Sequence, residues 1–483
     1  MRDSFVFRLL GYCLLGGSLI TAGLTIGCGS NTTQTTTPTT GSVTTLLSDP
    51  PVCGAPWGQF ENVWVTITKV TANISSTAAD TDSGWITLVD LTANPKQIDL
   101  LSLASTTCVL TQLGSTSGLP PGNYQQIRLY LLDNGAATGP SPNDCGAGNG
   151  YNCVVLTGGS AQELQLSSEA QTGLKIPPGQ MSGGGLTITA GQSADLVIDF
   201  DACSSILQEG NGKFRLKPTL RAGEMEVTNN SISGNVVDGT NQSPIAGASV
   251  LLEQPDPSGI DRVVRAGVTG SGGSFIFCPL PSGTYDVVVA AEATTGVITT
   301  TYNATIAFSV PLGTALNNFP LVPETASGTG SMPATITGQI TSVGSGGATG
   351  ADITLSALQQ ATPTGGSPVQ VTIPIFGVIS QPPTITTTTN PSGTACPAGT
   401  DCFNYSLQVP ASNPQVGTFT SGSITYGAPA TGTVTYSING TTPDCTASAP
   451  SPATISSVTV TPGATTSVGT ALAFSGCTAP AAM

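Results

Sequence analysis

The sequence predicts an all-β chain built from tandem antiparallel β-sandwiches. It contains 60 Gly and 36 Pro among 483 residues, and only 8% of its residues are charged. Gly, Pro and β-branched residues lower helix propensity, whereas short strands joined by tight turns suit this composition. Hydrophobic residues make up 39% of the chain, which is enough for buried cores. Several segments also alternate apolar and polar residues with the period of two that is typical of a half-buried strand.

The first 28 residues are predicted to export the chain. Arg2 and Arg8 precede an apolar stretch from Leu9 to Ile26, and small Gly27 stands directly before Cys28. A basic start, an apolar stretch and a small residue before the cut are typical of a secretory signal. A single membrane span is the alternative, although the stretch is near the lower length limit for one.

The end of this segment resembles the lipobox of bacterial lipoproteins, in which signal peptidase cleaves before a lipid-carrying Cys. Thr25 stands where that motif usually has Leu, so a plain secretory signal remains an alternative. The resemblance makes residues 1–27 a lipoprotein signal peptide and Cys28 the lipidation site. It implies a lipid-anchored protein of the bacterial cell envelope. Gly29 after the Cys favours the outer membrane, by resemblance to sorting rules in Gram-negative bacteria.

Residues 28–40 are Thr-rich and are predicted to form a disordered tether. A first β-sandwich is expected over residues 41–227, because runs such as ENVWVTITKV and YQQIRLYLLD alternate with period two. Turn clusters such as LPPGN separate these runs. A short helix is expected over residues 204–210, with Asp201 as its cap.

The order of the motifs in this first region is specific. It resembles a bacterial family of exported domains, domain of unknown function 4382, which implies no activity but agrees with an exported lipoprotein. The blocks that carry the resemblance are VWVTITKV, WITLVDL, DLLSL, LPPGNYQQIRLYL, TGLKI, LVIDFDA and FRLKPTLR.

The segment 230–323 resembles a carboxypeptidase regulatory-like domain, a module of transthyretin-type sandwich fold. Such modules are mostly structural spacers, and the fold superfamily also contains sugar-binding members, so the resemblance implies a spacer or a glycan-binding module. The matching residues are Gly234, Val236, Asp238, Pro244, Ile245, Gly247, Ala248, Val250, Gly273, Phe275, Phe277, Leu280, Pro281, Gly283, Tyr285 and Val287.

After a Ser/Gly/Thr-rich linker (324–333), residues 334–483 are expected to form a diverged β-sandwich. The run ITGQITSVGSGGATGADITLSAL echoes the start of the preceding module with a spacing that differs by one residue. The Phe-x-Phe half of that module does not recur. The last region is therefore interpreted as a degenerate repeat of the second one.

Charge and composition exclude several classes of function. The formal net charge is −15 with only 12 basic residues, which argues against nucleic acid as a partner. The chain contains no histidine, so Ser-His-Asp and Cys-His catalysis and His-type zinc sites are excluded. We therefore expect a protein that is not an enzyme and needs no cofactor, with calcium as the one candidate ion.

The cysteines predict disulfides in an oxidising compartment. Ten remain besides Cys13 in the signal and the anchor candidate, and an even number in an exported chain is typical of disulfide pairing. Two candidate pairs bracket short loops, and a third could cross-link the last region. The other four cysteines cannot be paired from sequence. The three candidate pairs are Cys145 with Cys153, Cys396 with Cys402, and Cys445 with Cys477.

Asp195, Asp199 and Asp201 share one face of the strand in DLVIDFDA and form the best cluster of carboxylates. Carboxylates two residues apart on a strand are about 7 Å apart, a separation compatible with shared calcium or paired acid/base work. The favoured interpretation is a solvent-exposed face that is balanced by basic residues. Lys213, Arg215 and Lys217 alternate along FRLKP with the same parity, and Arg128 does likewise on its strand. Calcium is the speculative alternative.

Exposed aromatic rings would indicate a sugar-binding surface, but only 5% of residues are aromatic. Trp57, in the APWGQ loop, and Tyr151 are the candidate glycan contacts. The sequence thus favours a non-catalytic, lipid-anchored envelope protein that binds or scaffolds polysaccharide, another envelope polymer or a protein. The alternatives are an accessory subunit or carboxylate-dependent remnant of an extracellular hydrolase, and a purely structural spacer.

Overall fold

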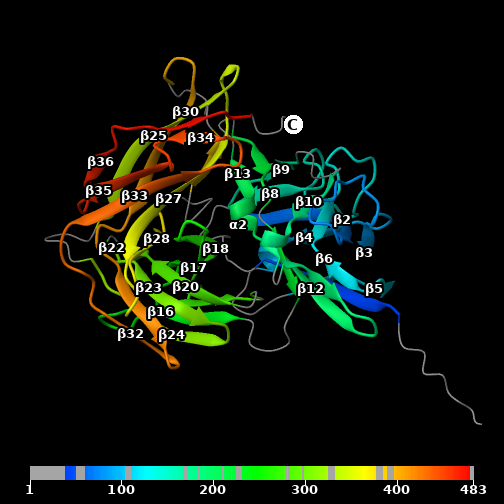
Figure 1. Cartoon of the computed structure of the whole chain (residues 1–483), viewed down its shortest axis with the longest axis horizontal. Helices are drawn as coiled ribbons and strands as arrows, with labels where there is room; N and C mark the ends of the chain where they lie inside the picture. Colours follow the sequence, from blue (N-terminus) through cyan, green and yellow to red (C-terminus); the bar gives the residue numbers. More distant parts are fainter. Residues whose placement is uncertain are drawn as a thin grey trace, which may run out of the picture. The chain divides into compact units, whose positions relative to one another are not determined.

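The computed structural model confirms an all-β fold. It describes residues 39–49, 60–103, 110–166, 172–181, 184–208, 212–218, 220–224, 231–278, 280, 283–295, 298–324, 332–376, 385–388 and 396–478 (Figure 1). We call the described residues within 39–224 the first part, those within 231–324 the second part and those within 332–478 the third part. No helix in the described ranges is long and apolar enough to cross a membrane.

The first part consists of two main sheets that enclose one hydrophobic core. The smaller sheet has the strand order β15-β12-β1-β5, with β1 and β12 parallel, and the larger one is built around β2. The strands are β1 (Gly41–Ser48), β2 (Phe60–Asn73), β3 (Ile86–Asp90), β4 (Lys96–Asp99), β5 (Thr111–Leu119), β6 (Gly122–Tyr124), β7 (Gln126–Leu131), β8 (Cys153–Leu156), β9 (Ala161–Gln165), β10 (Leu174–Ile176), β11 (Leu186–Ile188), β12 (Ser193–Phe200), β13 (Ile206–Gln208), β14 (Phe214–Leu216) and β15 (Leu220–Glu224).

The helical elements whose residues are described in the first part are single turns. These are η1 (Leu100–Ser102), η2 (Pro178–Gln180) and α2 (Ala202–Ser205). The helix expected over residues 204–210 is therefore shorter and begins earlier, because Ile206 already belongs to β13. Ile206 and Leu207 are buried, so packing of these apolar side chains outweighs the local helix signal.

The second part contains a three-stranded sheet, β19-β16-β24, which faces the strands β18, β17, β20 and β23 across a shared core. A separate hairpin joins β21 to β22. The strands are β16 (Ile232–Asp238), β17 (Ser249–Pro255), β18 (Ile260–Val268), β19 (Ser274–Phe277), β20 (Thr284–Ala290), β21 (Glu292–Thr295), β22 (Ile298–Thr301), β23 (Thr305–Pro311) and β24 (Thr314–Leu321).

The third part supplies a sheet around β25 and several strands that extend the second part's larger sheet. Its strands are β25 (Ala334–Gly344), β26 (Gly347–Ala348), β27 (Asp352–Ala361), β28 (Val369–Ile373), β29 (Ile385–Thr388), β30 (Asp401–Val409), β31 (Gln415–Thr420), β32 (Ser423–Tyr426), β33 (Val434–Thr441), β34 (Ala447–Ala449), β35 (Thr454–Val460), β36 (Thr465–Ser467) and β37 (Leu472–Ser475).

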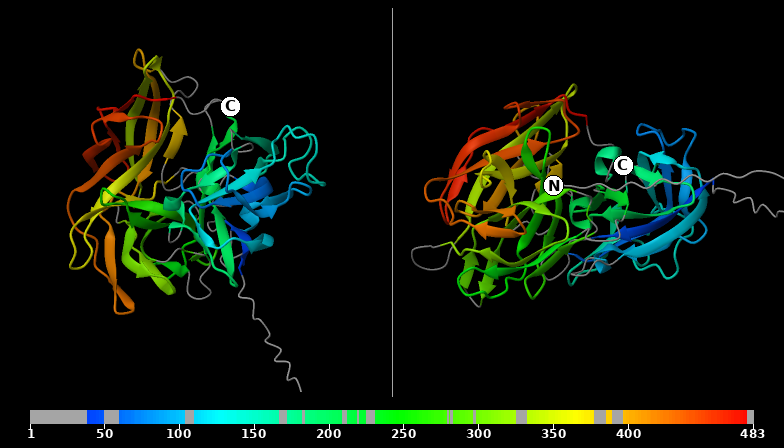
Figure 2. Two further views of the ribbon diagram at one scale, coloured as in Figure 1. Left: turned by 45° about the vertical axis from the view of Figure 1, so that its right-hand side comes forward. Right: turned by 60° about the horizontal axis from the view of Figure 1, so that its bottom comes forward.

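One sheet thus runs through the second and third parts. Its order is β32-β31-β23-β20-β17-β18-β28-β27-β33-β35, so third-part strands flank the second part's strands on both sides. Both junctions are parallel: Ile260 pairs with Gln370, and Thr305 pairs with Gln415. Figure 1 shows yellow β28 beside green β18, and Figure 2 shows the orange β31–β32 hairpin from two further sides. A hydrophobic cluster shared by both parts includes Leu251 and Ile353.

The residues behind the repeat hypothesis occupy matching strands. Ile232 and Ile336 lie in β16 and β25, each in a sheet apart from the long one, whereas Val250 and Ile353 lie in β17 and β27 of the long sheet. The relation between the two regions, and the boundaries suggested by sequence, stay predictions.

Candidate functional site

Two of the predicted site residues, Cys28 and Trp57, lie outside the described residues. Tyr151 is described and lies half-buried at the end of the connection between β7 and β8. Its main-chain carbonyl accepts hydrogen bonds from the Thr66 hydroxyl (2.6 Å) and the Gln97 side-chain amide (3.0 Å). The ring packs against Gly139, where an added Cβ would meet a ring carbon at 2.3 Å. Glycine at this position therefore allows the ring to lie against the loop backbone.

The loop that ends at Tyr151 is held by side-chain contacts as well as by a disulfide. The Asn134 side-chain oxygen accepts hydrogen bonds from the backbone N–H groups of Tyr151 (3.0 Å) and Asn152 (2.9 Å), and its amide donates to the Leu164 carbonyl. The Cys145–Cys153 disulfide closes the loop at its end. Tyr151 is thus presented on a stiff loop.

The aspartates of β12 differ in their surroundings. Asp195 is half-buried opposite Thr44, while Asp199 lies opposite Ser48 and Arg221, and both Asp199 and Asp201 are buried. The expectation of a solvent-exposed face is therefore wrong at Asp199 and Asp201. The face is covered because β18 of the second part brings a cation to it, which sequence spacing could not indicate.

That cation is Arg265, which forms an ion pair with Asp199. Both side chains are almost fully buried, at 4% and 5% exposed. Burial raises the pKa of Asp199 to about 6, although the charge of Arg265 acts in the opposite direction. Burial also lowers the pKa of Arg221 to about 10. The pair links β12 of the first part to β18 of the second.

A third carboxylate, Asp49, joins this group from the end of β1. It is fully buried, and one of its oxygens accepts a hydrogen bond from the backbone N–H of Ala202 (3.3 Å). Burial raises its pKa well above the usual range, and the charges of Asp201 and Asp199 add to the shift. Asp49 was not predicted as a site residue, because a single acid after an apolar strand carries no sequence signal of burial. We call Asp49, Asp199, Asp201, Arg221 and Arg265 the arginine–aspartate cluster.

A second link joins the first part to the third. One terminal nitrogen of Arg215 contacts both carboxylate oxygens of Asp352, at 2.9 and 3.1 Å, and the Lys217 ammonium lies 3.7 Å from the same carboxylate. Asp352 in turn donates its backbone N–H to Asp444 (2.8 Å). Two of the basic residues that were expected to balance the β12 aspartates, Arg215 and Lys217, therefore pair with an acid of the third part.

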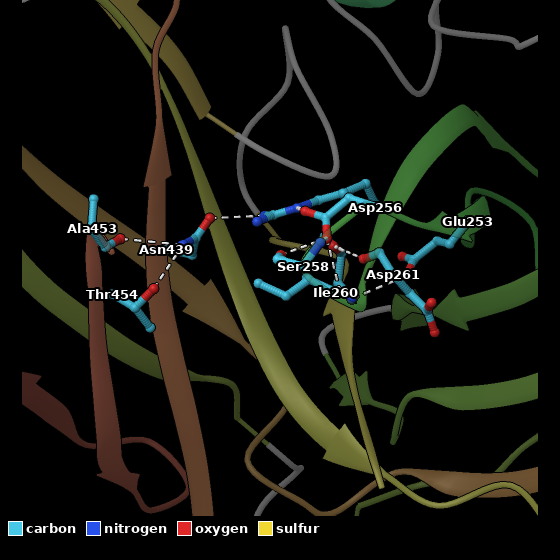
Figure 3. A network of polar contacts seen from close by, with 10 residues as sticks. Glu253, Asp256, Ser258, Ile260, Asp261, Asn439, Ala453 and Thr454 are labelled. Atoms are coloured by element: carbon cyan, nitrogen blue, oxygen red, sulfur yellow. Dashed lines mark hydrogen bonds and ion pairs between the residues drawn. The ribbon is translucent and has the colours of Figure 1, made fainter. Parts of the chain in front are cut away.

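A further group of carboxylates lies where β28 meets the second part. Glu253 of β17 and Asp261 of β18 are buried, and Asp286 of β20 lies directly opposite Glu253. Burial raises the pKa of all three, that of Asp261 to about 7. Figure 3 shows Glu253 and Asp261 close to the turn that carries Asp256. We call Glu253, Asp261 and Asp286 the acidic trio.

The described residues contain no group of three or more His, Cys, Asp or Glu side chains placed to hold a metal ion. The speculative calcium site at Asp195, Asp199 and Asp201 gains no support from this arrangement and stays a prediction. The buried carboxylates instead contact arginines, backbone N–H groups or each other. In the described part of the chain, these contacts of the buried carboxylates connect neighbouring strands.

The structure contains the three candidate disulfides: Cys145–Cys153, Cys396–Cys402 and Cys445–Cys477. The first two close short loops, and the third joins residues 32 positions apart in the third part. Cys278 of the second part is also disulfide-bonded. These bonds fit the oxidising compartment that the cysteine content indicates.

Comparisons with known proteins give a family match within the first part. Residues 40–218 match the family model described as a domain of unknown function (DUF4382), which confirms the resemblance seen in the sequence blocks. A search of curated proteins finds no match.

Solved structures give distant similarities. The Bacillus anthracis TIE protein is 10% identical with a TM-score of 0.15, over 90% of this chain and 51% of that one, so the chain spans about half the length of that protein. A double mutant of the shaft pilin SpaA from Lactobacillus rhamnosus GG is 8% identical (TM-score 0.19; 60% and 100% covered). The major pilin subunit BcpA of Bacillus cereus is 11% identical (TM-score 0.17; 59% and 71% covered). These TM-scores are too low to support conclusions about fold or function.

Proposed function

We propose that this chain is a non-catalytic protein of the bacterial cell envelope. A lipid on Cys28 holds it to a membrane, which we take to be the outer membrane, and residues 28–40 tether the β-sandwiches to it. The modules over residues 41–227, 230–323 and 334–483, the second of carboxypeptidase regulatory-like type, present a surface that binds or scaffolds polysaccharide or another envelope protein.

The observation that supports this proposal best is the way the three parts are joined. Buried ion pairs connect β12 to β18 and Arg215 to Asp352, and one sheet passes through the second and third parts. Breaking a buried pair leaves an uncompensated charge, so such contacts hold their neighbours in fixed positions. A stiff assembly can hold a binding surface in a fixed orientation. Independent modules on flexible linkers would instead allow each module to move over a larger distance.

The distribution of titratable groups also supports a non-catalytic role. An enzyme without histidine would depend on carboxylates, Lys or Tyr that a substrate can reach. Among the described residues, the carboxylates with strongly raised pKa are buried in the arginine–aspartate cluster and the acidic trio. This placement gives the hydrolase alternative no observation in its favour.

The stiff loop that carries Tyr151 is the binding surface we propose. Aromatic rings stack on the apolar faces of sugars, and a ring that is already held in place loses little entropy on binding. Trp57 is proposed as a second contact from the sequence alone.

Two experiments test this function. The protein, purified from membranes in detergent, is passed over polysaccharide and envelope-fraction columns, and Tyr151→Ala and Trp57→Ala should weaken retention. Tyr130→Ala, a half-buried tyrosine on β7, is the matched control and should not. Lack of retention on every column would leave only the spacer alternative.

Labelled palmitate should be incorporated into the wild-type chain, and incorporation that persists in Cys28→Ser would contradict the anchor.

A further inference from the structure

The acidic trio places three carboxylates on one face of three neighbouring strands. Glu253 of β17 lies directly opposite Asp286 of β20, and on its other side it lies opposite Val263 of β18. Asp261 is two residues from Val263 along β18, and residues two apart on a strand point to the same face. Asp261 also pairs with Val371 of β28, so the trio lies beside the junction with the third part.

Two members of the trio, Glu253 and Asp261, are buried, Asp286 is half-buried, and two of the buried oxygens are unsatisfied. Glu253 is 0% and Asp261 2% exposed, and Oε1 of Glu253 and Oδ2 of Asp261 have no hydrogen-bond partner. Burial raises the pKa of Asp261 most, and the charge of Asp286 and a side-chain hydrogen bond to it raise this pKa further. Two carboxylates can form such a bond only if one of them holds a proton. The unpartnered oxygens and the carboxyl–carboxyl bond thus point to bound protons.

The elements packed around the trio supply hydrogen bonds rather than positive charge. From β23, the Ser309 backbone N–H donates to Asp286 (2.7 Å), and from β28 the Thr372 backbone N–H donates to Glu253 (3.0 Å). The nearby cation is Arg262, but its Nε binds Asp256 (2.9 Å) and one terminal nitrogen donates to Asn439 (2.8 Å). Figure 3 shows Asn439 contacting Ala453 and Thr454 on the other side of this network.

Thr372 connects the trio to the strand junction. Its N–H is held by the Glu253 carboxylate, and its hydroxyl donates to the main-chain carbonyl of Asp261 (2.8 Å). The register of β28 against β18 is short, with two residue pairs. A change in the charge of the trio therefore acts on a junction that few backbone contacts maintain.

We propose that the acidic trio is a proton-operated latch that keeps β28 seated on the second part while its carboxyl groups share protons and loosens β28 when those protons leave. In the closed state, protonated Asp261 donates to Asp286, and Glu253 accepts from Thr372. Loss of protons leaves two or three negative charges on adjacent strands without a paired cation, and such repulsion in a buried site is costly. Separation of β28 lets water reach the carboxylates.

The raised pKa values set the direction and the range of the response. Because the closed state binds protons more tightly than a hydrated open state, closing is favoured below the ordinary carboxyl pKa. That advantage is lost as the pH rises through the folded pKa of Asp261, which is about 7. The latch is thus closed in mildly acidic surroundings and loosens above neutral pH.

Hydrogen exchange measured by mass spectrometry tests this latch on the full chain, purified from membranes in detergent. Protection factors, corrected for the intrinsic exchange rate at each pH, are compared at pH 5 and pH 8 for peptides that cover β28 and for peptides that cover β2 and β7. We expect protection of β28 to fall by roughly tenfold or more beyond any fall in β2 and β7, which reports the general loss of stability between these values.

Variants separate the latch from general effects of pH. Asp261→Asn/Asp286→Asn should flatten the response of β28, because an amide can donate to its neighbour without titrating. Asp195→Asn, the same change at a half-buried carboxylate of the first part, should leave the wild-type response intact. If the double variant does not fold, Glu253→Gln takes its place and should reduce the response. An equal change in β28 and β2, no change in β28, or a wild-type response in the trio variants would overturn the proposal.

Discussion

Arg265 of β18 and Asp199 of β12 form an ion pair across 66 residues of sequence, with both side chains almost fully buried. This contact joins the first and second parts at a point where sequence patterns predict a solvent-exposed face. A buried pair of this kind contributes little net stability compared with well-packed apolar residues, but loss of one partner leaves the other charge buried and unpaired.

Arg265→Met should therefore lower the free energy of unfolding by about 3 kcal/mol or more, since Asp199 loses its partner inside the protein. Arg265→Met/Asp199→Leu should recover most of that loss. Urea unfolding followed by tryptophan fluorescence measures both. A double variant that is no more stable than the single one would show that the pair does not act as a unit.

Asp199 should also make stability depend on pH. Its folded pKa of about 6 lies above the ordinary value of 3.8, so the folded state binds more protons than the unfolded state between these values. The stabilisation is present in full below pH 4 and is lost as the pH rises through 6. Asp49 acts in the same direction, because burial raises its pKa as well.

In an unfolding series from pH 4 to pH 7, Asp199→Asn should show a shallower decline in stability than the wild-type chain. Asp256, whose pKa is lowered to about 2 by hydrogen bonds from Ser258 and Arg262, should not contribute in this range. Asp256→Asn is therefore the control, and its stability should decline with pH as steeply as that of the wild-type chain. Identical slopes for Asp199→Asn and the wild-type chain would contradict the role assigned to Asp199.

Among Cys145–Cys153, Cys396–Cys402 and Cys445–Cys477, the last should stabilise the fold most. It closes 32 residues, against 8 for Cys145–Cys153 and 6 for Cys396–Cys402. Loop-closure entropy predicts about 3–4 kcal/mol for the longest loop and about 1 kcal/mol less for the shorter ones. Paired Cys→Ala variants, compared by thermal unfolding, test this order of stabilisation. A larger loss of stability on removal of either short-loop disulfide would contradict it.

Gly139→Ala should disturb the loop that carries Tyr151. The added Cβ would lie 2.3 Å from the ring, so either the ring or the backbone must move. We expect faster cleavage of this loop by protease under native conditions. Gly272→Ala is the control, since nothing lies within 4 Å of its added Cβ. Equal cleavage rates in Gly139→Ala and the wild-type chain would contradict tight packing of the ring.

Local sequence signals were sufficient for the fold class and for the short-range disulfides. Alternation in DLVIDFDA places Asp199 and Ile198 on opposite faces of β12, and Cys145 and Cys153 bracket a loop that is rich in Gly and Asn. These features depend on neighbours within one element or one turn, where periodicity and spacing are informative.

Long-range partners could not be predicted. Nothing near Asp199 in the sequence indicates Arg265, and nothing near Arg215 indicates Asp352. The sheet shared by the second and third parts depends on parallel pairing of β18 with β28. The sequence instead predicts a linker over residues 324–333 and therefore two separate domains. Such contacts arise from packing between elements, on which strand periodicity gives no information.

The buried ion pairs and the shared sheet lead us to expect that the three parts unfold as one body. Differential scanning calorimetry of the full chain measures this, because a single cooperative unit gives equal calorimetric and van't Hoff enthalpies. We predict one transition for the wild-type chain and separate transitions for Arg215→Met/Arg265→Met, which loses the two buried arginine ion pairs that join the first part to the others. Three independent transitions in the wild-type chain, unchanged in the variant, would show that the parts unfold separately.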